Sequence, residues 1–284
     1  MQLCMARMPH WSVPIGRRLR DAARMNRHDF LNLLLGAGAA GSGLLGCAPA
    51  SQSISPTAGA RPKIAALCFD LFTLFDPRSV VEVARNITPE RAAALCETWR
   101  VRQFEYAWLR VAAGQYRDFR HVTGEALDYA AEVHAVTLST AQRESLIAAY
   151  STLRPWPDTV AHLQRWKQRG LRMAPLANYS PRMLEELLAH AGVSDFFETQ
   201  LSTDRAHTFK PAAAAYALGT QTFGLPKEQI AFCAFGGWDA AGAKWFGYPT
   251  FWVNRLRVTG ERLAPGPDGT GPTLAEFARF VDTW

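Results

Sequence analysis

The chain has 284 residues, of which 48% are hydrophobic, 20% charged and 11% aromatic, a composition that excludes disordered and fibrous proteins. Its formal net charge of +6 lies almost entirely at the amino end. Residues 1–62 hold seven Arg and two acidic residues, which leaves 24 basic and 23 acidic residues in the remainder. The body is therefore close to neutral. Because it has no basic stripe interleaved with aromatic residues, we expect no nucleic-acid binding.

The first 47 residues have the pattern of an export signal. Five Arg between Arg17 and Arg27 precede an uncharged run from Phe30 to Ala50, in which Leu residues are diluted by Gly and Ala. A basic segment followed by an apolar one is typical of a signal peptide, and the dilution argues against a membrane-spanning helix. Residues 48–62, rich in Ser, Pro, Ala and Gly, are expected to form a flexible linker. A disordered tail is the alternative interpretation of this region.

Two short motifs in this leader resemble bacterial export signals. The sequence N-R-H-D-F-L at residues 26–31 resembles the twin-arginine motif with His in place of the second Arg, and L-L-G-C at residues 44–47 resembles a lipobox. The resemblance implies an exported, periplasmic or membrane-anchored lipoprotein, whose link to the membrane is a lipid on Cys47. Met25 directly precedes the first motif, so translation starts either there or at Met1.

Three Cys lie beyond the leader. Cys68 and Cys233 fall in apolar, strand-like runs, where a free thiol behaves as a small hydrophobic group, and Cys96 is the third. No C-x-x-C spacing is present. We therefore expect neither a disulfide framework nor catalysis by Cys.

The folded body opens on a short apolar run that ends in an acid. Residues 63–69 lack the polar alternation of a half-exposed strand, which favours a central strand of a parallel sheet, buried on both faces. Asp70 would then lie at the carboxyl end of that strand, where ligands bind in open α/β sheets. The alternative is an acid that only caps a helix or a turn.

The pattern over residues 89–153 is helical throughout. Apolar residues recur at three- and four-residue intervals at its start, a second helical segment spans residues 124–135, and a third spans residues 139–150, with Ser and Gln spaced as a capping box. No strand-like run interrupts them. The sequence therefore predicts an all-helical insert after the first strand.

Strand and helix patterns alternate from residue 157 onward. Helices are predicted at residues 158–169, 180–191 and 240–246, and strands at residues 171–177, 230–234 and 250–253. Alternation of this kind predicts a parallel sheet in a three-layer α/β fold.

Four motifs in this body resemble those of the haloacid dehalogenase superfamily, in which a strand-end Asp attacks the substrate. Residues 70–76 resemble the first motif, although Thr73 follows Asp70 by three residues where the family spacing is four. Asn178, directly after the predicted strand 171–177, resembles the second motif. The third is represented by Lys210-Pro211 with Tyr216 six residues after the Lys.

The fourth motif of the dehalogenases, S-x-N-x-W-D-x-x-G-A, is only partly present. Trp238 and Asp239 match, as does the following Gly-Ala pair, but Ala234 and Gly236 stand where the family has Ser and Asn. In the second motif, Ala177 stands at the usual hydroxyl position. These three positions therefore lack the side-chain donors that the family uses.

The resemblance covers almost all of residues 63–284 and is closest to the 2-haloacid dehalogenases. It implies a core of residues 63–82 and 157–284, with a three-layer, Rossmann-like parallel sheet, and a helical cap of residues 83–156. It also implies hydrolytic dehalogenation of short 2-haloalkanoic acids through an aspartyl ester, giving 2-hydroxy acids.

The resemblance further implies a role for each site residue. Asp70 would be the nucleophile, Arg100 in its Trp-Arg context would bind the leaving halide or the substrate carboxylate, and Lys210 would keep Asp70 ionised. Asp239 would hold Lys210 or the hydrolytic water. The remaining predicted substrate contacts are the orienting residues Thr73, Asn178 and Tyr216 and the pocket-lining residues Phe72, Phe119 and Trp238.

Two other functions remain as alternatives. One is a catalytically impaired protein that binds small acids, because three expected donors are missing. The other, least favoured, is a magnesium phosphatase, which would need acids where Phe72 and Phe235 stand. We therefore expect no metal and no cofactor, with a small 2-haloacid as the partner; a homodimer is left open, as are the enantiomer and the physiological substrate.

Overall fold

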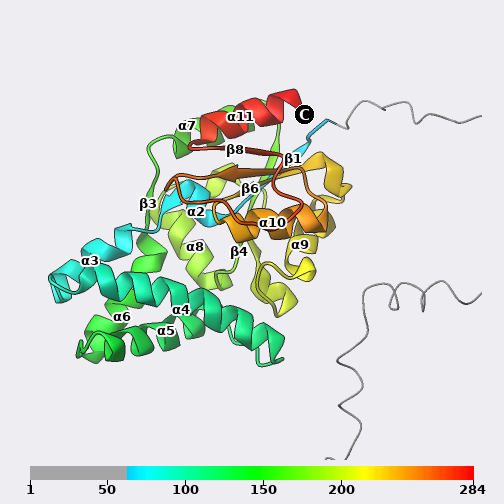
Figure 1. The fold of residues 1–284 in the computed structure, drawn as a ribbon. Coiled ribbons are helices and arrows are strands. Elements are labelled where there is room, and N and C mark those ends of the chain that lie inside the picture. Colours follow the sequence, from blue (N-terminus) through cyan, green and yellow to red (C-terminus); the bar gives the residue numbers. More distant parts are fainter. Residues whose placement is uncertain (1–62) are drawn as a thin grey trace, which may run out of the picture. The chain divides into compact units, whose positions relative to one another are not determined.

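The computed structural model describes residues 63–284 (Figure 1), so the predicted signal peptide, the lipid anchor at Cys47 and the linker lie outside the described residues. A six-stranded parallel sheet forms the centre, in the order β5-β4-β1-β6-β7-β8. Its strands are β1 (Ala66–Phe69), β4 (Arg172–Ala177), β5 (Leu201–Ser202), β6 (Ile230–Ala234), β7 (Thr250–Val253) and β8 (Gly269–Gly271). The predicted three-layer α/β fold is confirmed.

β1 is central because its side chains are apolar on both faces. Leu67 and Phe69 pack into one apolar cluster, whereas Ala66 and Cys68 pack into a second cluster on the opposite face. All four are fully buried. The strand is shorter than predicted because its pairing with β4 and β6 begins only at Ala66.

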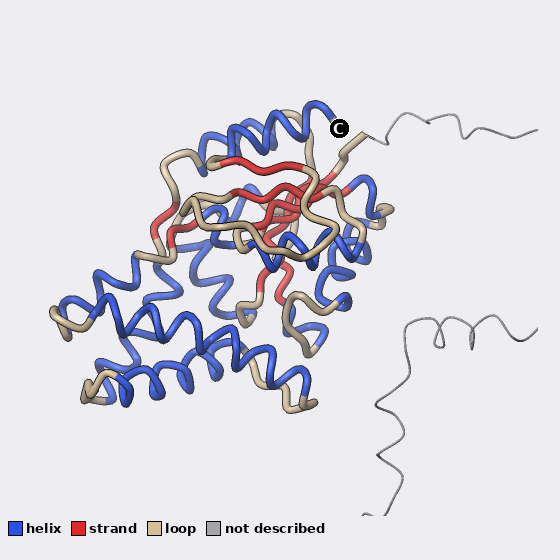
Figure 2. The backbone as a smooth tube through the Cα atoms, viewed as in Figure 1, coloured by secondary structure: helices blue, strands red, loops and turns tan. Residues whose placement is uncertain are grey.

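Helices cover both faces of the sheet, as Figures 1 and 2 show. On one face, α7 (Thr159–Gln168) and α11 (Leu274–Thr283) place Trp166 and Phe277 against Phe69, with ring centroids 5.4 and 5.9 Å from it. On the other face lie α9 (Ala213–Phe223) and α10 (Gly237–Phe246). The helix after β4 is α8 (Pro181–His190). These helices cover the faces of the sheet and leave the ends of its strands uncovered.

A separate group of helices connects β1 to the rest of the sheet. It comprises α3 (Ser79–Ile87), α4 (Ala92–Ala112), α5 (Phe119–Val133) and α6 (Thr140–Ala148), called here the cap helices. A two-stranded antiparallel pair, β2 (Phe75–Asp76) and β3 (Arg154–Pro155), marks where the chain enters and leaves this group. All described residues fall within one compact unit, so the domain boundaries at residues 83 and 156 stay predictions.

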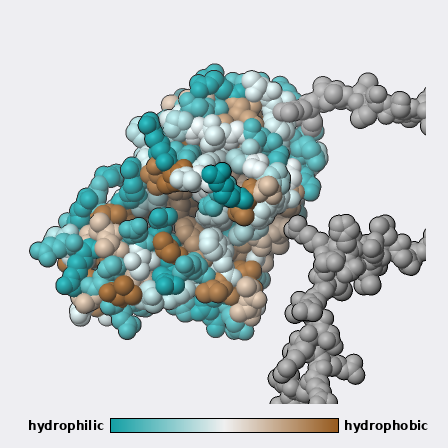
Figure 3. All heavy atoms as spheres, in the orientation of Figure 1, coloured by the Kyte–Doolittle hydropathy of each residue, from teal (hydrophilic) through white to brown (hydrophobic). Residues whose placement is uncertain are grey.

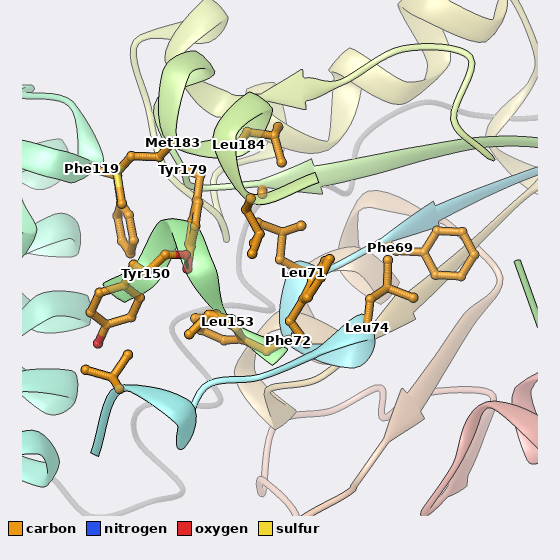
Figure 4. Close-up of a cluster of buried hydrophobic side chains, with 14 of the residues drawn as sticks. Phe69, Leu71, Phe72, Leu74, Phe119, Tyr150, Leu153, Tyr179, Met183 and Leu184 are labelled. Atoms are coloured by element: carbon orange, nitrogen blue, oxygen red, sulfur yellow. Dashed lines mark hydrogen bonds between the residues drawn. The ribbon is translucent and has the colours of Figure 1, made fainter. Parts of the chain in front are cut away.

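Cap and core share one apolar cluster. Figure 4 shows Phe119 and Tyr150 beside Tyr179, which follows β4, and Phe72, which follows β1, also contacts Tyr179. All four are almost fully buried. The contact between the cap helices and the strand ends is therefore mainly apolar. It lies next to Asp70.

The short elements are single turns. They are α2 (Leu71–Leu74) and the 3₁₀ segments Ala149–Thr152, Ser194–Phe196, Thr203–Ala206 and Lys227–Gln229.

Several boundaries differ from those predicted, for local reasons. The helix expected at residues 124–135 begins earlier, as α5, because Asp118 accepts a hydrogen bond from the amide of His121. The capping box at Ser139 and Gln142 is confirmed at the start of α6. The strands β6 and β7 have the predicted limits, whereas α3, α9, α11, β5 and β8 were not predicted.

No helix within residues 63–284 is long and apolar enough to cross a lipid bilayer. On the face drawn in Figure 3, apolar residues are scattered among hydrophilic ones.

Candidate active site

Asp70 lies at the carboxyl end of β1, where its backbone turns directly into α2. Its amide still donates to the carbonyl of Cys233 at 2.9 Å, which extends the pairing with β6. Its carboxylate caps α2, with Oδ2 accepting from the amide of Phe72 at 3.1 Å. The side chain is 15% exposed. Asp70 therefore caps a turn and also presents a carboxylate at the ligand-binding edge of the sheet.

Lys210 bridges Asp70 to a second carboxylate. Its Nζ donates to Asp70 Oδ1 and to Asp239 Oδ2, both at 2.7 Å. Lys210 comes from the loop before α9 and Asp239 from the first turn of α10, and both are buried. The fold thus brings together three charged groups that are far apart in the sequence.

The charges of this cluster do not cancel. Burial raises the pKa of Asp239 to about 6, against the attraction of Lys210. Burial lowers the pKa of Lys210, but Asp239 and Asp70 together raise it above its ordinary value. Lys210 is therefore protonated at neutral pH. One ammonium shared by two carboxylates leaves the cluster net negative when both are ionised.

Asn178 follows β4 and offers an unused donor. Its Oδ1 accepts from the amide of Lys210 at 2.9 Å, which fixes the orientation of the side-chain amide. Its Nδ2 is buried and has no hydrogen-bond partner within residues 63–284. A buried donor without a partner is costly, so Nδ2 is suited to a ligand oxygen or halide.

A small cavity opens beside Asp70. Its volume is about 60 Å³. Its wall is formed by Asp70, Leu71, Phe72, Arg100, Phe104, Phe119, Ala177, Asn178, Tyr179, Phe235, Gly236 and Trp238. An apolar cavity with few polar groups is typical of a small-molecule site, and its size restricts the ligand to a few heavy atoms.

Aromatic rings give this wall a fixed shape. Phe119 stacks on Tyr179 with centroids 5.3 Å apart, and Phe72 meets Tyr179 and Phe235 edge-on at 6.2 and 5.8 Å. Trp238 contacts Phe104 of α4 at 5.3 Å. The predicted lining residues Phe72, Phe119 and Trp238 all lie in this wall.

Arg100 enters the wall from α4 of the cap. Its side chain is exposed, and its guanidinium makes no hydrogen bond or ion pair within the described part of the chain. A free guanidinium at an apolar cavity favours an anionic ligand, because its fork of donors pairs with a carboxylate.

Two predicted substrate contacts lie outside the cavity wall. Thr73 is fully buried behind Asp70, and its Oγ1 donates to the carbonyl of Asp70 at 2.6 Å. Tyr216 is fully buried as well, and its Oη donates to Asp239 Oδ1 at 2.7 Å. Neither lines the cavity. The hydroxyl groups of Thr73 and Tyr216 are therefore both engaged within the protein, one by the carbonyl of Asp70 and the other by the carboxylate of Asp239.

Asp239 also lies outside the cavity wall. Its two carboxylate oxygens accept from Lys210 and from Tyr216. This geometry favours the first of its two expected roles, holding Lys210, over the second, holding water.

The three positions without side-chain donors differ in their surroundings. Ala177 lies in the cavity wall, whereas Ala234 is fully buried at the end of β6. Gly236 lies under the indole of Trp238, so a Cβ there would come within 2.7 Å of Nε1. The amides of Gly236 and Gly237 make no hydrogen bond within residues 63–284, so they are unused backbone donors at the start of α10.

Sequence reasoning missed several of the lining residues, among them Phe104 and Tyr179, and a supporting cluster. Phe104 lies one turn after Arg100 on α4, and Tyr179 directly follows Asn178, so both could have been found from their neighbours. No sequence signal pointed to the supporting cluster, which consists of Trp156, Asp158 and Arg255 next to α2.

That cluster binds the carbonyl groups at the end of α2. Trp156 Nε1 donates to the carbonyl of Phe72 at 3.0 Å, and Arg255 donates twice to that of Thr73. Arg255 is held in turn by a bidentate ion pair with Asp158. Helix-end carbonyls lack partners within their own helix, so these bonds fix the turn that carries the nucleophile.

The donor set around the cavity does not suit a magnesium ion. Phe72 and Phe235, at the positions where a phosphatase of this superfamily has acids, place phenyl rings in the wall. Within residues 63–284, no three His, Cys, Asp or Glu side chains are grouped so as to hold a metal.

Comparison with known proteins agrees with this geometry. Residues 64–247 match the family model for haloacid dehalogenase-like hydrolases. The haloacetate dehalogenase H-2 of Moraxella sp. (strain B) is 36% identical over 220 residues, covering 77% of this chain and 98% of that protein. The (S)-2-haloacid dehalogenase of Pseudomonas sp. (strain YL) is 35% identical, covering 78% and 95%.

Solved structures of L-2-haloacid dehalogenases also resemble the chain. The L-2-haloacid dehalogenase from Xanthobacter autotrophicus superposes with a TM-score of 0.73 at 32% identity, covering 77% of this chain and 98% of that one. A second structure of that enzyme has chloropropionic acid covalently bound, with the same score and coverage. The chain therefore belongs to the haloacid dehalogenase-like hydrolases, with close similarity to (S)-2-haloacid dehalogenases.

Proposed function

We propose that this hydrolase cleaves the carbon–halogen bond of short 2-haloalkanoic acids and releases 2-hydroxy acids. The observation that carries the proposal is the position of Asp70, paired with a buried Lys210 and open to an apolar cavity of about 60 Å³ that Arg100 also lines. A carboxylate nucleophile, an apolar wall for the halogen and a cation for the substrate carboxylate are thereby combined in one small site.

The charges support this assignment. Binding of a 2-haloacid brings its negative carboxylate close to a cluster that is itself net negative. Binding therefore needs a further cation. Arg100, without a partner in the described structure, supplies it. Asn178 Nδ2 adds a neutral donor for the carboxylate or the departing halide.

In the first step, a carboxylate oxygen of Asp70 attacks the carbon that bears the halogen. The new C–O bond forms as the C–halogen bond breaks, and the halide leaves with the electron pair. The configuration at that carbon is inverted. Lys210 holds Asp70 Oδ1 in place, and the bond from the Phe72 amide holds Oδ2. The aromatic wall excludes water from the attack.

In the second step, water attacks the carbonyl carbon of the Asp70 ester. The ester C–O bond breaks, one proton of the water passes to the departing alkoxide oxygen to give the 2-hydroxy acid and the other passes to solvent, so that Asp70 is regenerated as a carboxylate. The oxyanion that develops needs donors. The available ones are the Phe72 amide, the free amides of Gly236 and Gly237, and Asn178 Nδ2 once the halide has left.

Oxygen labelling tests this route. With enzyme in excess over (S)-2-chloropropanoate in ¹⁸O-water, we expect the label in the peptide that contains Asp70 and an unlabelled 2-hydroxypropanoate. Label in the product of that first turnover would contradict an aspartyl ester. The Asp70→Asn variant is the control, and it should release no halide.

A catalytically impaired protein that binds small acids is the second candidate, because Ala177, Ala234 and Gly236 provide no side-chain donors. It predicts binding of 2-chloropropanoate without halide release. A phosphatase predicts turnover of a phosphate ester that needs magnesium, whereas the dehalogenase route predicts halide release that is insensitive to chelators.

We also propose that the protein is exported and anchored through a lipid on Cys47, because of its basic leader and its L-L-G-C motif. Fractionation of cells that express the full chain tests this: we expect processed protein in the membrane fraction, and Cys47→Ala should release it. Full-length protein in the cytosol, with its leader intact, would contradict export. Light scattering on the purified protein distinguishes a monomer from the homodimer that the sequence left open.

A further inference from the structure

A second, larger cavity adjoins the proposed active site. Its volume is about 260 Å³, against about 60 Å³ for the cavity at Asp70. The residues that line it are Pro77, Arg78, Val80, Val81, Ala93, Cys96, Glu97, Arg100, Tyr150, Phe235 and Leu256. The site beside Asp70 is thus the smaller of two adjoining spaces, and the larger one has no role in the reaction described above.

Only Arg100 and Phe235 line both cavities. Phe235 follows β6 and is fixed from two sides, because its carbonyl accepts from Trp252 Nε1 at 2.8 Å and its ring meets that of Phe72 edge-on at 5.8 Å. Phe235 is therefore held in place where the two cavities adjoin. Arg100 presents one guanidinium to both.

The chemistry of the second cavity suits a hydrocarbon chain. Its wall has an aliphatic part, with Val80 and Val81 from α3, Ala93 from α4 and Leu256 from the segment after β7, beside the rings of Tyr150 and Phe235. Of its three charged groups, Arg78 is paired with Asp76 at 2.8 Å, whereas Glu97 and Arg100 are exposed to solvent. An alkyl chain gains from burial there, and no polar partner has to be supplied for it.

We propose that the second cavity is a subsite for the alkyl chain of longer 2-haloalkanoic acids, and that Phe235 closes it and so sets the chain-length limit. The proposal rests on the function proposed above. The substrate carboxylate stays at Arg100 and the halogen-bearing carbon at Asp70, while the chain extends past residue 235. With Phe235 in place, only acids that fit the small cavity are turned over efficiently.

A chain-length series tests this limit. The rates of halide release from (S)-2-chloropropanoate and (S)-2-chlorohexanoate are compared in the wild-type protein and in Phe235→Ala. Burial of one methylene group is worth about 4-fold in binding, so three added groups raise the ratio of kcat/KM for the long and short acids by about 10- to 60-fold in the variant. An unchanged ratio would overturn the proposal.

Filling the second cavity provides the matched control. Ala93→Trp, added to Phe235→Ala, blocks the cavity and should abolish the gain for the long acid. Ala94→Trp, at the neighbouring exposed Ala of α4 that lines neither cavity, should preserve the gain. Equal effects of the two Trp substitutions would contradict a subsite at this place.

A binding measurement separates this proposal from the proposed function. The dissociation constants of propanoate and hexanoate, measured by calorimetry, need no turnover, and Phe235→Ala should tighten hexanoate relative to propanoate. If the protein releases no halide from any acid, the proposed function fails, but the calorimetric ratio still decides on the subsite. Should Phe235→Ala not fold, Phe235→Leu is measured in its place, with the same direction expected and the same unchanged ratio counting against the proposal.

Discussion

The guanidinium of Arg255 donates two hydrogen bonds, of 3.0 and 2.8 Å, to the carbonyl oxygen of Thr73, three residues after Asp70. The same guanidinium forms a bidentate pair with Asp158 at 3.2 and 2.8 Å, and it lies 4.9 Å above the ring of Trp156. The turn that carries the nucleophile is therefore held from outside by a planar, fixed group.

We expect Arg255→Lys to lower kcat by about 10- to 100-fold with little change in KM. Lysine keeps the charge but lacks the fork that reaches Thr73 and Asp158 together. Loss of that support displaces Asp70 relative to the bound acid, and small displacements of a reacting group are costly. Steady-state kinetics measures the split, and thermal unfolding reports any general loss of stability.

Arg257→Lys is the control for this change, because Arg257 is exposed and makes none of these contacts. If KM rises while kcat is unchanged in Arg255→Lys, the residue acts on substrate binding and not on the position of Asp70.

The sequence could predict the elements whose apolar runs are buried regardless of context. β6 and β7 have the predicted limits because each is a short apolar run, fully buried between neighbouring strands. β8 could not be predicted, since it is three residues long with two Gly and exists only by pairing with β7. α11 carries a capping box, Thr273 and Glu276, which was a readable signal that we missed.

The candidate site likewise contains residues that could be predicted from the sequence and contacts that could not. Strand-end positions placed Asp70 and Asn178 at one edge of the sheet, because parallel strands end together. The buried contacts of Thr73 depend on side chains from elsewhere in the fold. Arg255 lies 182 residues from Thr73, and Asp158 lies 97 residues from Arg255, separations over which no spacing rule operates.

The pH dependence of turnover should have an acidic limb near pH 6. Burial raises the pKa of Asp239 to about 6 despite the attraction of Lys210. Below that pH the carboxyl is protonated, loses its charge and holds Lys210 less firmly, so the rate rises with pH up to about 6 and then levels off. A 2-haloacid is ionised across this range and does not contribute the limb.

Asp239→Asn tests this assignment. The variant should be slower above pH 6 and should lack the limb at about 6, which pH-rate profiles under substrate saturation reveal. If the limb persists unchanged in the variant, another group is responsible.

The three Cys of the folded body should resist thiol reagents in the native protein. Burial raises the pKa of Cys68 to about 12 and that of Cys96 to about 11, and it raises that of Cys233 further. The thiolate is the reactive form. We expect iodoacetamide at pH 8 to label these sites only after denaturation, as shown by mass spectrometry of the peptides. Labelling of Cys68 in the active protein would contradict the closed packing between β1 and its neighbouring helices.

Restoring a missing donor should help at one position and fail at another. Ala177→Ser places a hydroxyl in the cavity wall beside Asn178, and we expect it to raise kcat by about 10-fold or more, because one preorganised donor is worth about 10²- to 10³-fold at an ideal position. Gly236→Asn should give no gain, since its Cβ would lie 2.7 Å from Trp238 Nε1. Halide-release rates of the two variants provide the comparison. A gain in Gly236→Asn but not in Ala177→Ser would contradict the roles assigned to these two positions.

Hydrolysis of the ester, and not its formation, should be the slow step. Attack by Asp70 uses groups that are all in place: the carboxylate, Lys210 paired with it at 2.7 Å, and Arg100 at the cavity. Attack by water on the ester needs donors that stabilise the oxyanion. At Ala177, Ala234 and Gly236 none is supplied by a side chain, which leaves backbone amides and Asn178 Nδ2. Loss of one preorganised donor costs about 10²- to 10³-fold, enough to make the second step limiting.

Rapid-quench kinetics distinguishes the two steps. We expect a burst of halide close to one equivalent per enzyme, followed by slow steady release, and an ester adduct on the Asp70 peptide in samples quenched during the slow phase. In Ala177→Ser the burst should remain while the steady phase accelerates, because only the second step uses the added hydroxyl. Steady release without a burst and without an adduct would place the slow step before the ester, whereas no release and no adduct would favour the small-acid-binding alternative.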